Sequence, residues 1–189
     1  MIWFTSDLHI DHKNKHGTGI IDYCKRPFSD IQEMWETIKK NWNKNVKVDD
    51  EIWVLGDFAF NNSAFGKQFL ADQLNGTKRL ILGNHDGDLR HNRGAFSIVL
   101  EQAQIRMGRR QFVLSHYPYR YSEDRYPDRA PIDNGLWLLC GHVHERWKIK
   151  NRMINVGQDQ WNFTPIPQTK ICEIADKLDK KNLPGLRIT

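Results

Sequence analysis

The chain has 189 residues, of which 39% are hydrophobic, and its 28 lysines and arginines exceed its 23 acidic residues for a formal net charge of +5. This length suits one domain that buries its own core, so folding needs no disulfide or metal staple. No apolar stretch approaches membrane-spanning length, the start lacks a secretory signal pattern, and the three cysteines are too far apart for a disulfide framework. We therefore expect a cytoplasmic protein without membrane contact, built as one domain over residues 1–175 with a charged peripheral tail over residues 176–189.

The first half of the chain alternates between predicted strands and predicted helices. Apolar runs that predict buried strands lie at residues 2–4, 52–55 and 80–82. Between them, apolar side chains recur at helical spacing over residues 31–42, where Ser29 and Gln32 form a capping-box pattern, and over residues 65–74. This β-α-β-α-β order implies parallel strands joined by right-handed crossovers.

The second half leaves little room for helices. Residues 105–107 and 112–114 predict a hairpin, and further apolar runs follow at residues 137–140, 147–149 and 153–156. Asn151 and Arg152 lie at the expected turn between the last two runs. We expect an α/β fold in which a mixed-sheet β-sandwich is flanked by helices, with a parallel half followed by a more antiparallel half.

Blocks of potential metal ligands directly follow the buried strands. They are Asp7-Leu8-His9, Gly56-Asp57, Gly83-Asn84-His85-Asp86, His116 and Gly141-His142-Val143-His144. In an α/β sheet, ligands bind beyond the carboxyl ends of the strands, so these blocks are expected to meet in one site. Side chains two residues apart on an extended segment point the same way, which lets Asp7 and His9 hold one cation together. This mixture of carboxylate, amide and imidazole groups suits manganese, iron, zinc or nickel better than calcium.

The order of these blocks resembles that of the calcineurin-like metallophosphoesterases, in particular the small single-domain bacterial and phage members. Residues 22–28, 155–157 and 159–162 also look like segments of those proteins. The resemblance implies a hydrolase with two adjacent divalent metal ions, manganese being favoured, and a metal-bridging hydroxide as the nucleophile. It also implies the ligands of each ion. One ion would be held by Asp7, His9, Asp57 and His144, and the other by Asp57, Asn84, His116 and His142.

His85 and Asp86 are the predicted catalytic residues. His85 is not needed as a ligand in this scheme, and its imidazole can protonate the departing alkoxide or stabilise charge on the phosphate. Asp86 can orient His85 and stabilise its protonated form.

Three further residues are candidate contacts to the substrate. His12 closely follows the first ligand block and could touch a substrate phosphate, Arg26 could guide an anion, and Tyr119 belongs to an aromatic and basic cluster that could stack a base. Each also has a simpler interpretation, which is a loop residue for His12, a surface cation for Arg26 and a packing residue for Tyr119. The modest positive charge suits a phosphate ester such as a nucleotide or a nucleic-acid end, and the chemistry fits phosphomonoesters and phosphodiesters equally.

The sequence also allows two alternative functions. A nuclease with the same site needs an extended basic track, for which the sequence offers several arginines. They are Arg106, Arg109, Arg110, Arg120, Arg125 and Arg129. A non-catalytic binding module on this fold is expected to have lost ligands, and none is missing here. The natural substrate and the oligomeric state are also left open.

Overall fold

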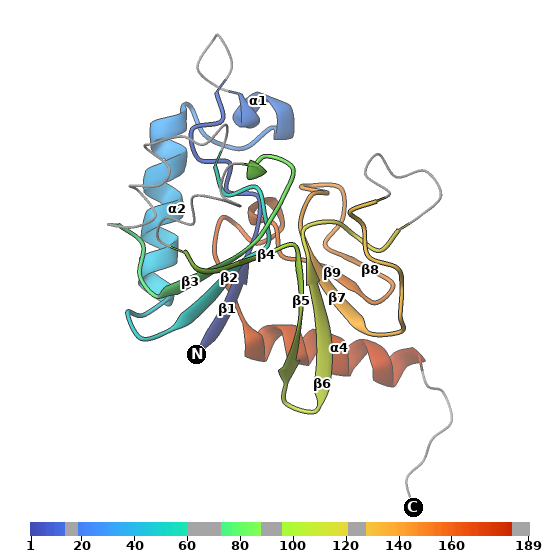
Figure 1. Cartoon of the computed structure of the whole chain (residues 1–189). Coiled ribbons are helices and arrows are strands. Elements are labelled where there is room, and N and C mark those ends of the chain that lie inside the picture. The colour runs from blue at the N-terminus through green and yellow to red at the C-terminus, as the bar shows by residue number, and fades with distance from the viewer. Residues whose placement is uncertain (14–18, 60–72, 88–95, 121–127, 183–189) are drawn as a thin grey trace, which may run out of the picture.

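The computed structural model describes residues 1–13, 19–59, 73–87, 96–120 and 128–182, with side chains described as far as residue 180. Its elements form two five-stranded sheets with helices outside them (Figure 1). The helix expected over residues 65–74 lies almost entirely outside the described residues. Within the described residues, no helix is both long and apolar enough to cross a membrane. The expected sandwich of mixed sheets flanked by helices is confirmed.

The first sheet has the strand order β10-β1-β2-β3-β4. Its strands are β1 (Ile2–Thr5), β2 (Glu51–Val54), β3 (Thr77–Ile81), β4 (Phe96–Leu100) and β10 (Ile166–Pro167). Strand β4 was not predicted. Strands β1 to β4 are parallel, as predicted for the first three of them, and β10 pairs antiparallel with β1. All four parallel strands therefore end at the same edge of the sheet.

The second sheet has the strand order β5-β6-β7-β9-β8. Its strands are β5 (Gln102–Met107), β6 (Arg110–Ser115), β7 (Trp137–Cys140), β8 (Ile149–Lys150) and β9 (Met153–Asn155). The predicted hairpin is present as the antiparallel pair β5 and β6, and Asn151 makes the turn between β8 and β9 with a φ of 53°. Strands β6, β7 and β9 are parallel to one another, so the second sheet is mixed.

Alternating side chains of the first sheet build two cores, because successive residues of a strand face opposite sides. On one side, Trp3, Ile52 and Val54 pack in a cluster with the apolar face of helix α2 (Ile31–Asn45). On the other side, residues such as Phe4 and Leu55 pack in a cluster with the second sheet. Strands β1, β2 and β3 thus each contribute to the helix layer and to the interior of the sandwich.

The predicted start of α2 is one residue too early. Asp30, rather than Ser29, is the N-cap, and its side chain accepts a hydrogen bond from the Glu33 amide (2.8 Å). The Glu33 carboxylate in turn accepts a hydrogen bond from the Ser29 amide (2.7 Å). The helix therefore has a reciprocal cap, and it begins one residue later than predicted. The apolar stripe of the helix is buried as expected.

Helix α4 (Gln168–Asn182) was not expected. Its Ile171 and Ala175 are buried in the core between the sheets, and Leu178 packs against the same cluster. The domain boundary expected after Ala175 therefore lies inside this helix. The short helix α1 (Ile20–Cys24) and the 3-10 turn η2 (Gln158–Gln160) complete the described helical elements.

Candidate metal centre

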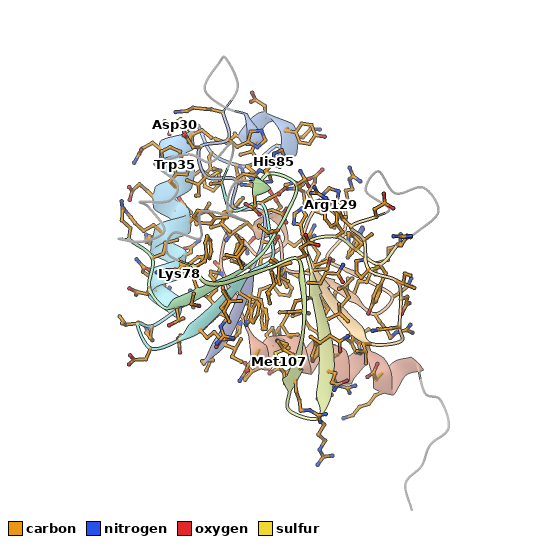
Figure 2. All side chains as sticks on the ribbon, in the orientation of Figure 1. Asp30, Trp35, Lys78, His85, Met107 and Arg129 are labelled. Carbon is orange, nitrogen blue, oxygen red and sulfur yellow. The ribbon has the colours of Figure 1, made fainter. Side chains whose placement is uncertain are left out.

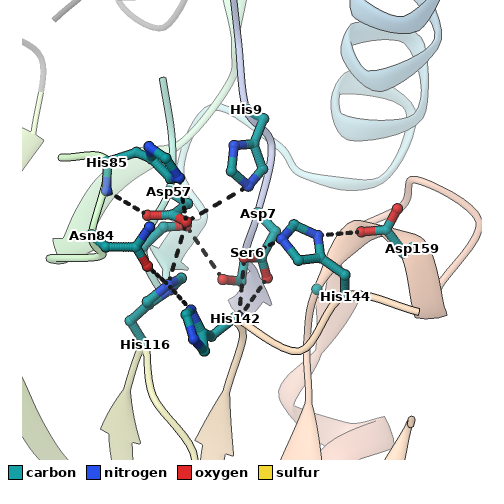
Figure 3. Close-up of polar contacts among 12 residues, drawn as sticks. Ser6, Asp7, His9, Asp57, Asn84, His85, His116, His142, His144 and Asp159 are labelled. Carbon is teal, nitrogen blue, oxygen red and sulfur yellow. Dashed lines mark hydrogen bonds and ion pairs between the residues drawn. The ribbon is translucent and has the colours of Figure 1, made fainter. Parts of the chain in front are cut away.

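The predicted ligands meet at the edge where the parallel strands of both sheets end (Figure 3). The loop after β1 lies along the loop after β2: the Asp7 amide donates to the Gly56 carbonyl (3.0 Å) and the His9 amide donates to the Asp57 carbonyl (3.0 Å). In the second sheet, the Gly141 amide donates to the His116 carbonyl (3.0 Å). Backbone pairing therefore continues past the strands and holds the ligand-bearing loops side by side.

One group of donors is formed by Asp7, His9 and His144, whose ligand atoms all lie within 4.8 Å of one another. The His144 Nε2 atom is 3.9 Å from the Asp7 Oδ1 atom, and the His9 Nε2 atom is 3.6 Å from the Asp57 Oδ2 atom. We call this group the first half-site. It comprises three of the four residues predicted for one ion, with Asp57 beside it.

The second half-site is formed by Asn84, His116 and His142. The His116 Nε2 atom lies 3.2 Å from the Asn84 Oδ1 atom, 3.3 Å from the His142 Nδ1 atom and 3.4 Å from the Asp57 Oδ2 atom. Asp57 thus faces His9 of one group and His116 of the other with the same oxygen. The two groups predicted from the sequence are assembled as expected, with Asp57 between them.

Several residues in the loops that carry the predicted ligands have a left-handed backbone conformation. Asp7, His9, Asp57, His142 and His144 all have a positive φ, between 45° and 69°. This conformation is uncommon outside glycine and costs about 1–3 kcal/mol at a residue. Its clustering at the ligands indicates that the surrounding structure imposes these turns.

Two glycines let the loops approach the ligands closely. A Cβ atom on Gly56, which has a φ of 90°, would collide with the His116 ring, and one on Gly141 would collide with the Ser6 side chain and the Asp7 carboxylate. The His116 Nδ1–H consequently reaches the Leu55 carbonyl and donates to it (2.8 Å). This bond leaves the Nε2 atom of His116 directed at Asp57 and Asn84.

Burial and the two ligand carboxylates set the protonation of the imidazoles. Burial lowers the pKa of His9 well below its usual value, and burial together with His116 lowers the pKa of His142 to about 3. Burial also acts to lower the pKa of His116, but Asp57, Asp7 and the bond to the Leu55 carbonyl together outweigh it and raise that pKa to about 9. Burial acts to raise the pKa of the Asp57 carboxyl, but His116, His9 and His85 together outweigh it and lower that pKa. The imidazoles around Asp57 thus favour its carboxylate form.

The donor set fits divalent metal ions. The Nε2 atom of His9 is buried and finds no hydrogen-bond partner among the residues that the structure describes. A buried polar atom without a partner is costly, and a bound cation would satisfy it. Carboxylate, amide and imidazole donors gathered around it match the preferences of first-row transition metals.

His85 lies at the open side of this centre. Its side chain is 30% exposed and its Nε2 atom is 4.0 Å from the Asp57 Oδ2 atom, while its amide donates to Asp57 Oδ1 (2.9 Å). His12 lies beside it with a ring-centroid distance of 5.4 Å, and burial, followed by the charge of His85, lowers the pKa of His12 to about 4. Both imidazoles can therefore face a substrate, and the role of His12 as a substrate contact stays a prediction.

Asp86 has a different set of partners from the one expected. One of its oxygens accepts from the amides of Asp57 (2.7 Å) and Gly83 (2.8 Å), and the other accepts from the Phe58 amide (3.0 Å). Burial, together with the charge of Asp57, raises the pKa of Asp86 to about 7. The structure thus shows Asp86 joining the loops after β2 and β3, instead of the predicted role of orienting His85.

Arg26 and Tyr119 also lie elsewhere than expected for substrate contacts. The Arg26 side chain is completely buried and forms a bidentate ion pair with Asp159 (2.8 and 3.0 Å). Tyr119 is buried in a small cluster with Leu138 and Met153, and its hydroxyl donates to the Leu136 carbonyl (3.0 Å). Both placements are internal, so the substrate-binding assignment of these two residues is corrected.

Asp159 is a site residue that the sequence reasoning missed. Its Oδ2 atom accepts a hydrogen bond from the Nδ1–H of His144 at 3.1 Å (Figure 3). A carboxylate on the far nitrogen of a metal-binding histidine fixes the ring and its tautomer. The signal for this role was available only as proximity in space, because Asp159 lies outside the ligand blocks.

Arg125 of the proposed basic track lies outside the described residues, and the described arginines of the track do not gather around the centre. Arg106, Arg109 and Arg110 belong to the hairpin of β5 and β6, whose turn is at the far end of these strands from His116. The six residues of β6 span about 17 Å. Figure 2 shows the same separation, with Met107 near the hairpin turn and both His85 and Arg129 near the site. The hairpin arginines therefore do not line the centre.

Comparisons with known proteins agree with this architecture. Residues 1–161 match the calcineurin-like phosphoesterase family. The chain is 36% identical over 188 residues to the gene 66 protein of Mycobacterium phage L5, covering 84% of this chain and 86% of the phage protein. It is 29% identical over 185 residues to the uncharacterized protein MJ1445 of Methanocaldococcus jannaschii, covering 93% of this chain and 92% of that one.

A solved structure extends the comparison to three dimensions. The protein of unknown function AQ665 from Aquifex aeolicus has a TM-score of 0.71 and 27% identity to this chain. The alignment covers 92% of this chain and 98% of that protein. The similarity thus extends over most of the length of both proteins.

Proposed function

The chain belongs to the calcineurin-like phosphoesterase family, and from this premise we propose that it is a metal-dependent hydrolase of phosphomonoesters or phosphodiesters with a dinuclear metal centre. The observation that carries the proposal is the convergence of two donor groups on the Asp57 carboxylate. The His9 Nε2 and His116 Nε2 atoms approach its Oδ2 atom at 3.6 and 3.4 Å from opposite groups. A carboxylate that serves both groups suits a centre of two adjacent ions.

Asp7, His9, Asp57 and His144 would hold one ion, and Asp57, Asn84, His116 and His142 the other. When bound, two divalent ions supply positive charge to the phosphate and lower the pKa of the attacking water, so that hydroxide forms near neutral pH. The mixed nitrogen and oxygen donors suit manganese, iron, zinc or nickel, and manganese is the ion that we favour.

His85 is proposed to deliver a proton to the leaving group. Its backbone is held by its own amide, which donates to Asp57 Oδ1 (2.9 Å), and almost a third of its side chain is exposed. An imidazole at the open face of a phosphate site can protonate the departing alkoxide or stabilise the charge on phosphate oxygens. The His12 ring, whose centroid lies 5.4 Å from that of His85, is proposed to contact the phosphate.

A small polar cavity adjoins the centre and can receive the rest of the substrate. It has a volume of about 90 Å³, and its lining includes Gly83, Tyr117 and Arg129. Arg129 donates to the Tyr117 hydroxyl (3.3 Å), and the Tyr117 ring lies 5.0 Å from that of His142. This small volume suits a compact phosphate ester or the end of a larger molecule, such as a nucleotide or a nucleic-acid end.

Hydrolysis by metal-stripped protein, before and after addition of manganese, tests the proposal. A chromogenic phosphomonoester and a chromogenic phosphodiester are assayed in parallel, with metal content measured on the same samples. We expect turnover to return with manganese, and the preferred ester shows which of the two classes is the substrate. Bound metal without turnover of either ester would favour the binding-module alternative.

A further inference from the structure

Arg26 and Asp159 form an ion pair behind the first half-site, although 133 positions separate them in the sequence. Arg26 follows helix α1, and Asp159 lies in η2, after strand β9. The guanidinium donates to both carboxylate oxygens, at 2.8 and 3.0 Å. The two side chains are 0% and 4% exposed, so solvent does not screen their interaction.

Each member of this pair contacts a different part of the first half-site. Asp159 accepts from the Nδ1–H of His144, which leaves the Nε2 atom of that ring facing Asp7. Arg26 donates to the backbone carbonyls of Asp7 (2.7 Å) and Leu8 (3.2 Å), between the two ligands Asp7 and His9. The pair therefore secures one ligand through its side chain and two through their backbone.

The backbone that Arg26 secures is the strained one. Asp7 and His9 have φ values of 58° and 54°, and such residues persist only where neighbouring groups enforce them. The two carbonyl contacts of Arg26 supply such enforcement at the turn of the loop. Breaking them would allow this segment to relax away from the geometry that aims Asp7 and His9 at one point.

The second half-site is secured in another way. Its His116 donates through Nδ1 to a backbone carbonyl, that of Leu55 (2.8 Å). In the first half-site, by contrast, His144 donates to the charged side chain of Asp159. The pair should therefore influence the two half-sites unequally.

A separate metal site at the same place is a competing interpretation. Ligand atoms of Cys24, His144 and Asp159 also lie within 4.8 Å of one another. Both oxygens of Asp159 are engaged by Arg26, and one of them also accepts from His144. A cation there would have to displace a buried guanidinium, so the group is better described as support for the neighbouring half-site.

We propose that Arg26 and Asp159 are positioning residues that set the metal affinity of the half-site formed by Asp7, His9 and His144. This inference rests on the proposed dinuclear centre. Loss of a carboxylate partner of a metal-binding histidine typically weakens metal binding about 10–100-fold. The expected signature is a weakening of that size in one of two binding events, with the other unchanged.

Calorimetric titration of metal-stripped protein with manganese measures both events without recourse to activity. Asp159→Asn is compared with His144→Ala and with the double variant that carries both changes. If Asp159 acts through His144, the double variant binds the affected ion no more weakly than His144→Ala alone. A purely structural effect would instead add to the loss in His144→Ala, and that result would overturn the proposal.

A second variant separates positioning from the cost of a buried unpaired charge. Asp159→Asn leaves Arg26 buried without its carboxylate, whereas Arg26→Met/Asp159→Asn removes both charges. A selective loss at least as large is expected in this variant, because it also removes the Arg26 contacts to the Asp7 and Leu8 carbonyls. Asp133→Asn is the matched control, because Asp133 also pairs with an arginine through two oxygens, at 3.0 Å each, but on the exposed surface.

The wild-type titration keeps the two proposals distinguishable. Wild-type protein that takes up two ions, together with an Asp159→Asn variant that binds both as tightly, would overturn only the positioning role. Wild-type protein that binds no manganese would overturn the dinuclear centre itself, and the positioning role with it.

Discussion

The two sheets of this protein contribute different chemistry to one site. The first sheet supplies both predicted ligand carboxylates, Asp7 and Asp57, as well as an amide, an imidazole and the partly exposed His85. The predicted ligands of the second sheet are all imidazoles, on the loops after β6 and β7. Strands β5 and β8, which run antiparallel to their neighbours, deliver none of the predicted ligands. Strand direction therefore decides which loops reach the centre, and the centre exists only where the carboxyl ends of both sheets face each other.

The largest effect is expected from Asp57→Asn, because Asp57 is the contact between the two sheets' ligands. Asparagine tolerates the left-handed φ of 51° at this position, so the loop should keep its shape. Loss of the bridging charge should reduce turnover by at least on the order of 10⁴-fold and weaken the binding of both metal ions. Steady-state kinetics with metal analysis check this, and a variant that retains two tightly bound ions would contradict the role given to Asp57.

His85→Ala should lower catalysis without changing metal binding at the place where the two sheets meet. Removal of a general acid typically costs about 10²–10⁴-fold in rate, so we expect a decrease in kcat in that range. Metal content should remain that of the wild type, because His85 is not a predicted ligand. Loss of both ions in His85→Ala would show that it belongs to the metal centre instead.

Gly56→Ala tests how closely the sheets must approach. The added Cβ would meet the His116 ring and lie 2.9 Å from the Gly83 Cα atom. We expect the free energy of unfolding to fall by about 1–3 kcal/mol and manganese affinity to fall with it.

Gly108→Ala is the matched control for this change. Gly108 also has a left-handed φ, of 59°, but nothing lies within 4 Å of an added Cβ there. Chemical denaturation of both variants separates backbone strain from the collision. Equal losses of manganese affinity in the two would show that the close approach at Gly56 is unimportant.

The smallest effect is expected at the opposite end of the first sheet. Asp50 accepts a hydrogen bond from the N-terminal ammonium (2.6 Å), which, together with the Lys47 amide, lowers the pKa of Asp50 to about 2 from 3.8. Because the folded-state pKa is the lower one, the stabilisation is complete above pH 3.8 and is lost as the pH falls towards 2. Denaturation midpoints across this window should decline less steeply in Asp50→Asn than in the wild type, with manganese affinity at neutral pH unchanged. Identical pH profiles would rule out this contribution.

The strands and most of the site could be predicted because their signals are local. Each ligand block directly follows an apolar run, so strand direction alone brings Asp7, Asp57 and His116 to one edge. The alternation of side chains along Ile2–Thr5 and its neighbours likewise follows from strand periodicity. These features depend on neighbouring residues rather than on distant ones.

The missing features depend on distant contacts or weak patterns. The pairing of Arg26 with Asp159, and of Asp86 with three backbone amides, is visible only after folding. Helix α4 carries a short stripe of Ile171, Ala175 and Leu178 within a highly charged segment, which hides its helical signal. Strand β10 contains Pro167, which is tolerated because this strand lies at the edge of its sheet.

The left-handed turns at the ligands restrict how this centre could be redesigned. Aspartate, asparagine and histidine are the non-glycine residues that best tolerate positive φ, and they are also the residue types of the predicted metal ligands. Cysteine or glutamate at Asp7, His9 or His144, introduced to alter metal selectivity, would have to adopt a strained positive φ. This strain would oppose any gain from the new coordination. Engineering of new metal preference should therefore begin at Asn84 or His116, where φ is not positive.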